Sequence, residues 1–254
     1  MSGHSKWSTI KRQKGATDIK RGQTFTKMAN AITIAAKSGG GDPESNFKLR
    51  VAIEAAKAVN MPKENIQRAI DRGLGKLQGQ ILEEVVYEGF GSAKAAFLVE
   101  GVTDNRLRTN QEVKNLFERL GGVLTGQGST AYMFDKKGEI KIKGKKGSTE
   151  QELLELIDLG AEDVEDYKDS YTKEQKYLVY TESADLTIMS NKITQAGFEV
   201  ESKEMVFKPN VTVEIYDPGT AKKLITLGER LEEHVDLQKV YANFDIPQDI
   251  VDKL

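Results

Sequence analysis

The first thirty residues concentrate positive charge at one end of the chain. They hold seven lysines and arginines against a single acidic residue, Asp18. Cations of this kind bind the phosphates of nucleic acid, and an aromatic ring among them can stack on an exposed base. The candidate contact residues of this leader (residues 1–30) are His4, Lys6, Trp7, Lys11, Arg12, Lys14, Lys20, Arg21 and Lys27.

Trp7 is the only tryptophan of the chain, and two interpretations of it stay open. The ring stacks on a base or ribose, or it pins the leader to the following helices as a hydrophobic anchor. The leader is also poor in acids, as organellar transit peptides are. Against a transit peptide, it runs directly into patterned helices without a break of the kind that cleavage needs.

The charge of the chain is divided unevenly along its length. Residues 1–76 hold 15 basic and 6 acidic residues, whereas the rest of the chain holds 22 basic and 33 acidic residues. The two parts therefore carry +9 and −11, and the whole chain carries −2. This asymmetry is typical of a nucleic-acid-facing end on an acidic body, and the alternative is a chance distribution of solvated charge.

Two further groups of cations are secondary candidates for phosphate contacts. Arg106 and Arg108 lie in TDNRLRT, where the preceding Asp and Asn also suit the start of a helix. Lys141 and Lys143 alternate with isoleucines in GEIKIKG, and six lysines fall between positions 136 and 146. Lysines also protect the edges of sheets against aggregation, and we expect this edge interpretation here.

Enzymatic chemistry finds little support in the residue types. The chain has no cysteine and only two histidines, His4 and His234, so a thiol nucleophile is excluded and a zinc site is not expected. KIKGKKGST lacks the order of residues that a phosphate-binding loop needs. Residues 150–169 hold nine acids against one lysine, and they predict a solvated acidic face. We expect no catalytic residue, no metal and no cofactor, and no apolar stretch has the length of a membrane span.

Apolar residues at three- and four-residue steps predict a helix over residues 23–38. Three glycines end it, and we expect Asp42 to cap a second helix with Pro43 at its first position. Pro62 should open a third, short helix that ends at Gly73. The apolar stripes of these helices are rich in alanine, which favours close packing among them.

Strands alternate with helices beyond residue 80. EEVVYEGF and KAAFLVEGVT read as paired strands, and a helix follows to about Leu120. Residues 136–208 show the order βαββαβ, which is the ferredoxin-like pattern. VTVEIYD, a helix over residues 219–234 and KVYANFD then supply elements that the first α/β half lacks.

The predicted fold class is α+β. An N-terminal three-helix domain is followed by two α/β sandwich domains, of which the ferredoxin-like one is inserted into the other. The predicted bounds are 1–79 for the basic leader and helical domain, 80–135 plus 209–254 for the discontinuous domain, and 136–208 for the inserted domain. Two α/β domains in simple series remain the alternative, because local periodicity does not distinguish the two topologies.

Eight short motifs, spread over nearly the whole chain, are similar to those of the YebC/PmpR family. They are GHSKW (3–7), KRGQTFTK (20–27), GGGDPESN (39–46), NMPKENIQRAI (60–70), YEGFG (87–91), TDNRLRT (103–109), GG (121–122) and VYANFDIP (240–247). The sequence departs from the family pattern at residues 92–94, where Ser-Ala-Lys stands in place of a Pro-Gly-Gly-like turn. This departure concerns the geometry of one hairpin.

The resemblance implies a cytoplasmic protein of three domains with a role in gene expression. Bacterial members are described as probable transcriptional regulators that bind DNA, and mitochondrial relatives are translational activators. Bacterial members have also been tied to the ribosome during difficult elongation. Because the resemblance begins at residue 3, it implies that the leader belongs to the mature protein.

Three functional hypotheses follow. The first is a non-enzymatic DNA-binding regulator of transcription, and the second is a ribosome-associated translation factor that contacts ribosomal or transfer RNA. The third, an enzyme with a carboxylate site, is disfavoured by the shortage of histidine and cysteine. A basic arm with one aromatic ring suits structured RNA slightly better than duplex DNA, whereas the family description favours transcription. The expected partners are nucleic acid and the ribosome, without a membrane, and we expect a monomer.

Overall fold

The computed structural model describes residues 4–7, 9–10, 21–77, 81–145, 147–169, 172–251 and 253. These residues form two compact units. The helical unit contains the described residues of 21–131 and 215–242. The ferredoxin-like unit contains those of 4–10, 132–214 and 243–253.

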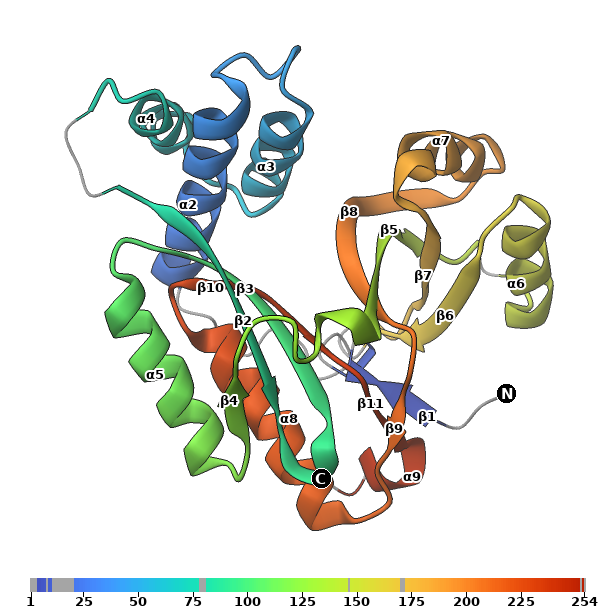
Figure 1. Cartoon of the computed structure of the whole chain (residues 1–254). Coiled ribbons are helices and arrows are strands. Elements are labelled where there is room, and N and C mark those ends of the chain that lie inside the picture. Colours follow the sequence, from blue (N-terminus) through green and yellow to red (C-terminus); the bar gives the residue numbers. More distant parts are fainter. Residues whose placement is uncertain are drawn as a thin grey trace. The chain divides into compact units, whose positions relative to one another are not determined.

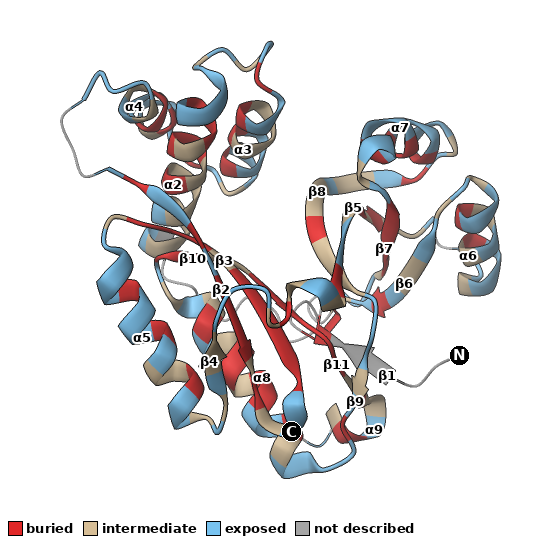
Figure 2. Ribbon diagram, in the orientation of Figure 1, coloured by how far each residue is buried: buried red, intermediate tan, exposed pale blue. Residues whose placement is uncertain are grey.

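The helical unit begins with three helices, which we call the helical module (Figure 1). They are α2 (Arg21–Gly39), α3 (Phe47–Ala58) and α4 (Lys63–Gly73). Both α3 and α4 pack against α2. Their inward faces form one core, seen as the buried stripes in Figure 2. The core consists of Ile32, Ala35, Ala36, Leu49, Ile53, Ala56, Met61, Ile66, Ala69 and Ile70.

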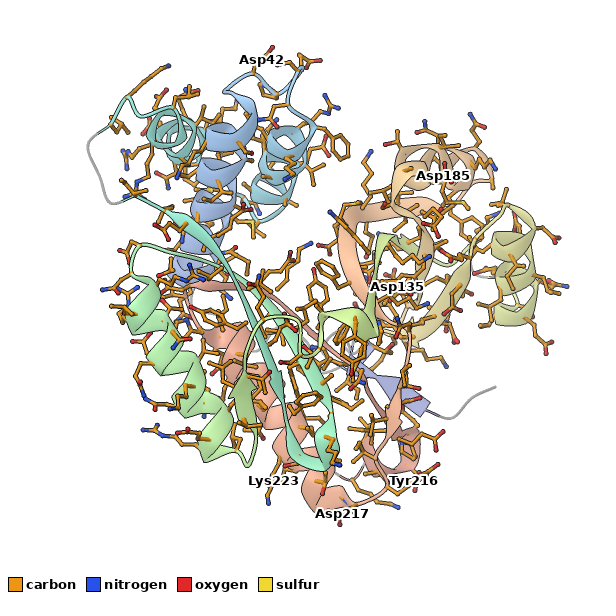
Figure 3. All side chains as sticks on the ribbon, in the orientation of Figure 1. Asp42, Asp135, Asp185, Tyr216, Asp217 and Lys223 are labelled. Atoms are coloured by element: carbon orange, nitrogen blue, oxygen red, sulfur yellow. The ribbon has the colours of Figure 1, made fainter. Side chains whose placement is uncertain are left out.

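The predicted cap of the second helix is wrong. Asp42, labelled in Figure 3, accepts hydrogen bonds from its neighbours Glu44 and Ser45 in a turn. The helix starts later, and its N-cap is Asn46, whose Oδ1 accepts the backbone N–H of Leu49 at 3.1 Å. The Asn46 amide also donates to the carbonyls of Ala35 and Gly40. Asn46 is the N-cap instead of Asp42 because its carboxamide both accepts and donates hydrogen bonds. It can therefore cap α3 and bind the end of α2 at the same time.

Gly73 allows the end of α4 to lie directly against α2. A Cβ at this position would stand 2.4 Å from the carbonyl oxygen of Thr33 and 2.8 Å from Cβ of Ala36. We expect Gly73→Ala to lower the free energy of unfolding by about 2–3 kcal/mol, because backbone rather than a flexible side chain must move. Urea unfolding measures this loss. Gly22→Ala is the matched control, since open space surrounds Gly22, and a loss as large in the control would contradict the packing argument.

A four-stranded sheet follows in the same unit. Its strands are β2 (Glu83–Phe90), β3 (Ala96–Thr103), β4 (Val123–Thr125) and β10 (Leu237–Ala242), in the order β10-β3-β2-β4. The short helix η1 (Ser92–Lys94) joins β2 to β3. Helices α5 (Arg106–Arg119) and α8 (Pro218–Glu233) pack on this sheet and on each other. A strand close to the C-terminus thus completes a sheet that begins near residue 83.

The second unit contains a βαββαβ arrangement. Its elements are β5 (Phe134–Lys143), α6 (Thr149–Asp158), β6 (Asp163–Lys168), β7 (Gln175–Glu182), α7 (Leu186–Gln195) and β8 (Glu199–Pro209). The strands pair antiparallel in the order β6-β7-β5-β8. Buried residues of β5 and β7 meet those of α6 and α7 in one core. This is the ferredoxin-like arrangement.

A three-stranded sheet accompanies it in the order β1-β11-β9. Its strands are β1 (His4–Lys6), β9 (Val213–Glu214) and β11 (Phe244–Pro247), and α9 (Gln248–Val251) follows β11. VTVEIYD was expected to complete the first α/β sheet. The strand that this segment forms, β9, instead pairs with β11, where the N–H of Val213 donates to the carbonyl of Asn243. β9 is only two residues long.

The predicted fold class is confirmed as α+β, with N-terminal helices followed by sheets. The exact domain bounds stay a prediction. Among the described residues, no helix combines the length and the apolar character that crossing a membrane requires.

Candidate nucleic-acid interface

The helical module carries exposed cations that make no ion pair with any residue the structure describes. Lys48 and Lys57 lie on α3, and Lys63, Arg68 and Arg72 lie on α4. The acids of α4 do not neutralise these side chains, since Asp71 binds Lys76 at 3.2 Å instead. The charge of this module is therefore available to a ligand.

Lys141 and Lys143 of the ferredoxin-like unit behave differently, because acids of a neighbouring strand neutralise them. Lys141 Nζ lies 2.8 Å from Glu201 Oε2, and Lys143 Nζ lies 2.7 Å from Glu199 Oε1. The hydrogen bond and charge of Glu199 raise the pKa of Lys143. The predicted secondary phosphate contacts at these two lysines are engaged within the protein.

The expectation that this lysine-rich strand lies at a sheet edge is also wrong. β5 lies between β7 and β8 and pairs with both along its length. Lys141 and Lys143 face glutamates of β8. The alternation of Lys and Ile in GEIKIKG therefore reflects cross-strand charge pairing in the middle of a sheet.

A cavity of about 400 Å³ opens between α2 and α4. α2 contributes Phe25, Ala29 and Asn30, and α4 contributes Asn65, Arg68 and Arg72. Thr26, Thr33, Met61, Ala69 and Leu77 complete the lining. Two guanidinium groups, two amides and an apolar wall thus meet in a space of the size that small ligands occupy.

The side-chain amides of Asn30 and Asn65 in this cavity have no hydrogen-bond partner within the described structure. The hydroxyl of the neighbouring Thr33 does have one. Thr33 donates to the carbonyl of Ala69 at 3.0 Å. Asn30 is only 7% exposed, yet no described residue accepts from or donates to its side chain, and the same holds for the half-buried Asn65. Neither amide is among the fully enclosed polar atoms that lack a partner, so both are open to the cavity and present donors and acceptors to a ligand.

In TDNRLRT the two arginines have different surroundings. Asn105 caps α5 by accepting the N–H of Arg108 at 3.0 Å. The guanidinium of Arg108 binds Asp104 at 2.9 Å and Asp236 at 2.7 Å. Arg106 is exposed, and no described residue forms an ion pair with it. Arg108 therefore joins α5 to the residues before β10, and of the two only Arg106 stays available to phosphate.

Asp236 is the centre of this arrangement. Burial raises its pKa, but hydrogen bonds from Thr109 and Arg108 outweigh that effect and lower the pKa below the ordinary value. Asp236 also comes close to His234 and Glu112, with one ligand-type atom of each within 4.8 Å of the others. The oxygen Oδ2 of Asp236 already accepts from Thr103, Thr109 and Arg108, so we assign the cluster a structural role.

Most of the predicted leader contacts fall outside the described residues or side chains. Lys11, Arg12, Lys14 and Lys20 lie outside the described residues. The side chains of His4, Lys6 and Arg21 are likewise outside the description, although the first two belong to β1 and the third begins α2. Lys27 donates to the carbonyl of Glu232. The leader contacts stay a prediction.

Trp7 acts as an anchor in the structure. Its side chain is 2% exposed and its ring centroid lies 5.7 Å from that of Phe244 in β11. β1 pairs with the same strand, and Thr9 and Ile10 are buried as well. The ring is thus covered rather than open to a base, and one of its aromatic partners lies in a strand of the C-terminal segment. Hydrophobic burial of the indole explains this placement.

The sequence analysis missed the residues of the α2–α4 cavity. A signal for three of them is present in NMPKENIQRAIDR, because Asn65, Arg68 and Arg72 recur at three- and four-residue steps and so share one side of a helix. No sequence signal relates them to Asn30, which lies on another helix. Tertiary packing brings these residues together.

Comparison with known proteins agrees with this architecture. The family description "TACO1/YebC protein N-terminal domain" matches residues 5–76, and "TACO1/YebC second and third domain" matches residues 82–244. Two relatives named probable transcriptional regulatory protein, from Persephonella marina and Geobacter sulfurreducens, are each 45% identical over 254 residues. The alignment covers 100% of this chain and 100% of each relative.

A solved structure is similar as well. The crystal structure of a conserved hypothetical protein from Aquifex aeolicus is 41% identical, with a TM-score of 0.83. The match covers 95% of this chain and 97% of the other. Together with the family matches along nearly the whole sequence, this shows that the chain belongs to the TACO1/YebC family.

Proposed function

We propose that this chain is a non-enzymatic regulator of gene expression that binds nucleic acid through its helical module and its leader, and that it acts in the cytoplasm. One observation carries the proposal. Five exposed cations of α3 and α4 have no ion pair within the described structure, whereas Lys141 and Lys143 of β5 are neutralised by glutamates. A cluster of unpaired cations on one group of helices is the electrostatic pattern expected of a phosphate-binding surface.

Regulation of transcription through DNA is the first form of this proposal. It draws support from the relatives, which are named probable transcriptional regulatory proteins. The leader residues Lys11, Arg12, Lys14, Lys20 and Arg21 would extend the basic surface along the phosphate backbone. Arg106 is a further proposed phosphate contact.

A translation factor that binds ribosomal or transfer RNA is the second form. The cavity between α2 and α4 favours it, because its amides and guanidinium groups suit an unpaired base, and RNA loops present such bases. Duplex DNA keeps its bases stacked and paired.

A binding comparison tests the proposal. The purified chain is titrated with a mixed-sequence DNA duplex and with intact ribosomes over a range of salt concentrations. If about five phosphates are contacted, log K against log salt should fall with a slope of about −4. Tighter binding to DNA supports the first form and tighter binding to ribosomes supports the second. Binding to neither, or a slope near zero, contradicts the proposal.

The contribution of the leader is measured in the same assay. Replacing Lys11, Arg12, Lys20 and Arg21 with glutamate should weaken both the affinity and the salt dependence, because several phosphate contacts are lost. Unchanged affinity in a folded variant would remove the leader from the interface and leave the helical module as the binding surface.

A further inference from the structure

We infer that the cavity between α2 and α4 is a subsite for one unpaired nucleotide of the bound nucleic acid strand. This inference rests on the proposed function and specifies what the helical module recognises. The chemical class of the ligand is a nucleoside monophosphate unit, with its phosphate at the two arginines of α4 and its base inside the cavity.

The phosphate end is defined by Arg68 and Arg72. They are four residues apart on α4, so their side chains lie on the same side of the helix, and both line the cavity. Both are exposed, and neither makes an ion pair within the described structure. Guanidinium groups bind phosphate oxygens in a bidentate manner. A phosphate at the rim therefore has two cations to bind and no protein acid to displace.

The base end is defined by Asn30 and Asn65. Each carboxamide offers two donors and an accepting oxygen, which is the pattern that hydrogen-bonds the edge of a nucleobase. Asn30 is more than nine-tenths buried and has no partner in the described structure. Its amide atoms are not fully enclosed, so they open into the cavity, where a ligand can bond to them. A base edge in the cavity would satisfy them.

The wall of the cavity suits a planar apolar face. Phe25, Met61 and Leu77 contribute to the lining beside the amides. A base inside a duplex is stacked and has its pairing edge occupied, so it cannot reach amides at the bottom of a cavity. The occupant must be an unpaired nucleotide. An acidic peptide would also satisfy the arginines, so the test below includes one as a competing ligand.

Nucleotide titration tests the subsite directly. The four ribonucleoside 5′-monophosphates and their deoxy counterparts are added to the full chain, and the side-chain amide signals of Asn30 and Asn65 are followed by NMR. We expect saturable shifts of both amides with at least one nucleotide, and the tighter series identifies RNA or DNA. Inorganic phosphate and a glutamate-rich peptide, at equal concentration, should leave the Asn30 amide unchanged. Equal shifts with phosphate or peptide, or none with any nucleotide, would overturn the subsite.

Variants then separate this inference from the proposed function. Asn30→Leu should lower the affinity for single-stranded nucleic acid about tenfold without changing the salt slope, because a base contact is lost. Arg72→Gln should reduce the slope by about 0.7, because a phosphate contact is lost. Asn110→Leu, at an exposed position of α5, is the matched control. Asn65→Leu serves the same purpose as Asn30→Leu at a less buried position, in case the first variant does not fold.

The outcomes are distinguishable. If the native chain binds no nucleic acid, the proposed function fails. If the native chain binds and both asparagine variants bind equally well, the nucleotide subsite fails while the proposed function stands.

Discussion

Replacing both Arg68 and Arg72 with glutamate should weaken the affinity of this chain for nucleic acid about a hundredfold at physiological salt. Each substitution removes an attraction to phosphate and adds a repulsion, and each contributes on the order of 1–2 kcal/mol. The effect should be large here because neither arginine has an ion-pair partner in the described structure. Fluorescence anisotropy with a labelled strand measures it.

A charge-matched variant provides the control. Lys222 and Lys223 are exposed on α8, and Figure 3 labels the second of them. Replacing both with glutamate changes the net charge by the same amount, so a long-range effect of charge alone would lower the affinity of both variants equally. We expect the α8 variant to bind within about threefold of the native chain. Equal losses in the two variants would show that α4 is not a contact surface.

Replacing Glu88 with glutamine should lower the free energy of unfolding by about 3 kcal/mol. Glu88 lies in β2 and is 3% exposed. Its carboxylate accepts the backbone N–H groups of Gly128, Thr130 and Ala131 at 2.7, 2.6 and 2.8 Å. Glutamine keeps the shape but removes the charge and turns one acceptor into a donor, so at least one of these N–H groups faces another N–H. Urea unfolding measures the loss.

The same carboxylate makes stability depend on pH. Burial raises the pKa of Glu88, but the backbone hydrogen bonds outweigh it, and the pKa in the folded state lies below the ordinary value of 4.5. The stabilisation is thus fully present above about pH 4.5 and is lost as the pH falls through the folded-state pKa. The difference in stability between native chain and variant should shrink in that acidic range.

Glu84 supplies the control for this prediction. It lies on the same strand but is exposed. Glu84→Gln should change the free energy of unfolding by less than about 0.5 kcal/mol. If Glu88→Gln has an equally small effect, or if its effect does not change with pH, the carboxylate does not hold the loop at residues 126–131.

Local sequence patterns correctly predicted the type and the order of several helices and strands. The periodic apolar residues of α2, the stop at Gly73 and the βαββαβ order of residues 136–208 are all present. Local patterns did not decide which of two residues caps α3. Asp42 and Asn46 both suit an N-cap, and Asn46 is selected by contacts with Ala35 and Gly40 at the end of the preceding helix.

Long-range pairing was harder to predict. The local sequence of Lys141 and Lys143 is typical of an edge strand. In the structure β8 pairs with β5, and its Glu201 and Glu199 form ion pairs with these lysines. For Trp7 the sequence leaves a stacking ring and a hydrophobic anchor equally open, and β11 decides for the anchor by bringing Phe244 against the ring. In both examples the partner is tens or hundreds of residues away, and no local period encodes which distant strand will pair.

The amino-acid order thus specifies the helices of the module, the ferredoxin-like succession and the excess of positive charge in residues 1–76, because propensity, periodicity and charge are local properties. Folding in three dimensions settles which cations remain unpaired and which amides share a cavity. Arg68 and Arg72 stay open because no acid of the described structure forms an ion pair with them, while packing of α4 on α2 brings Asn65 to the same cavity as Asn30. The candidate site is a product of that packing, since its two halves come from separate helices.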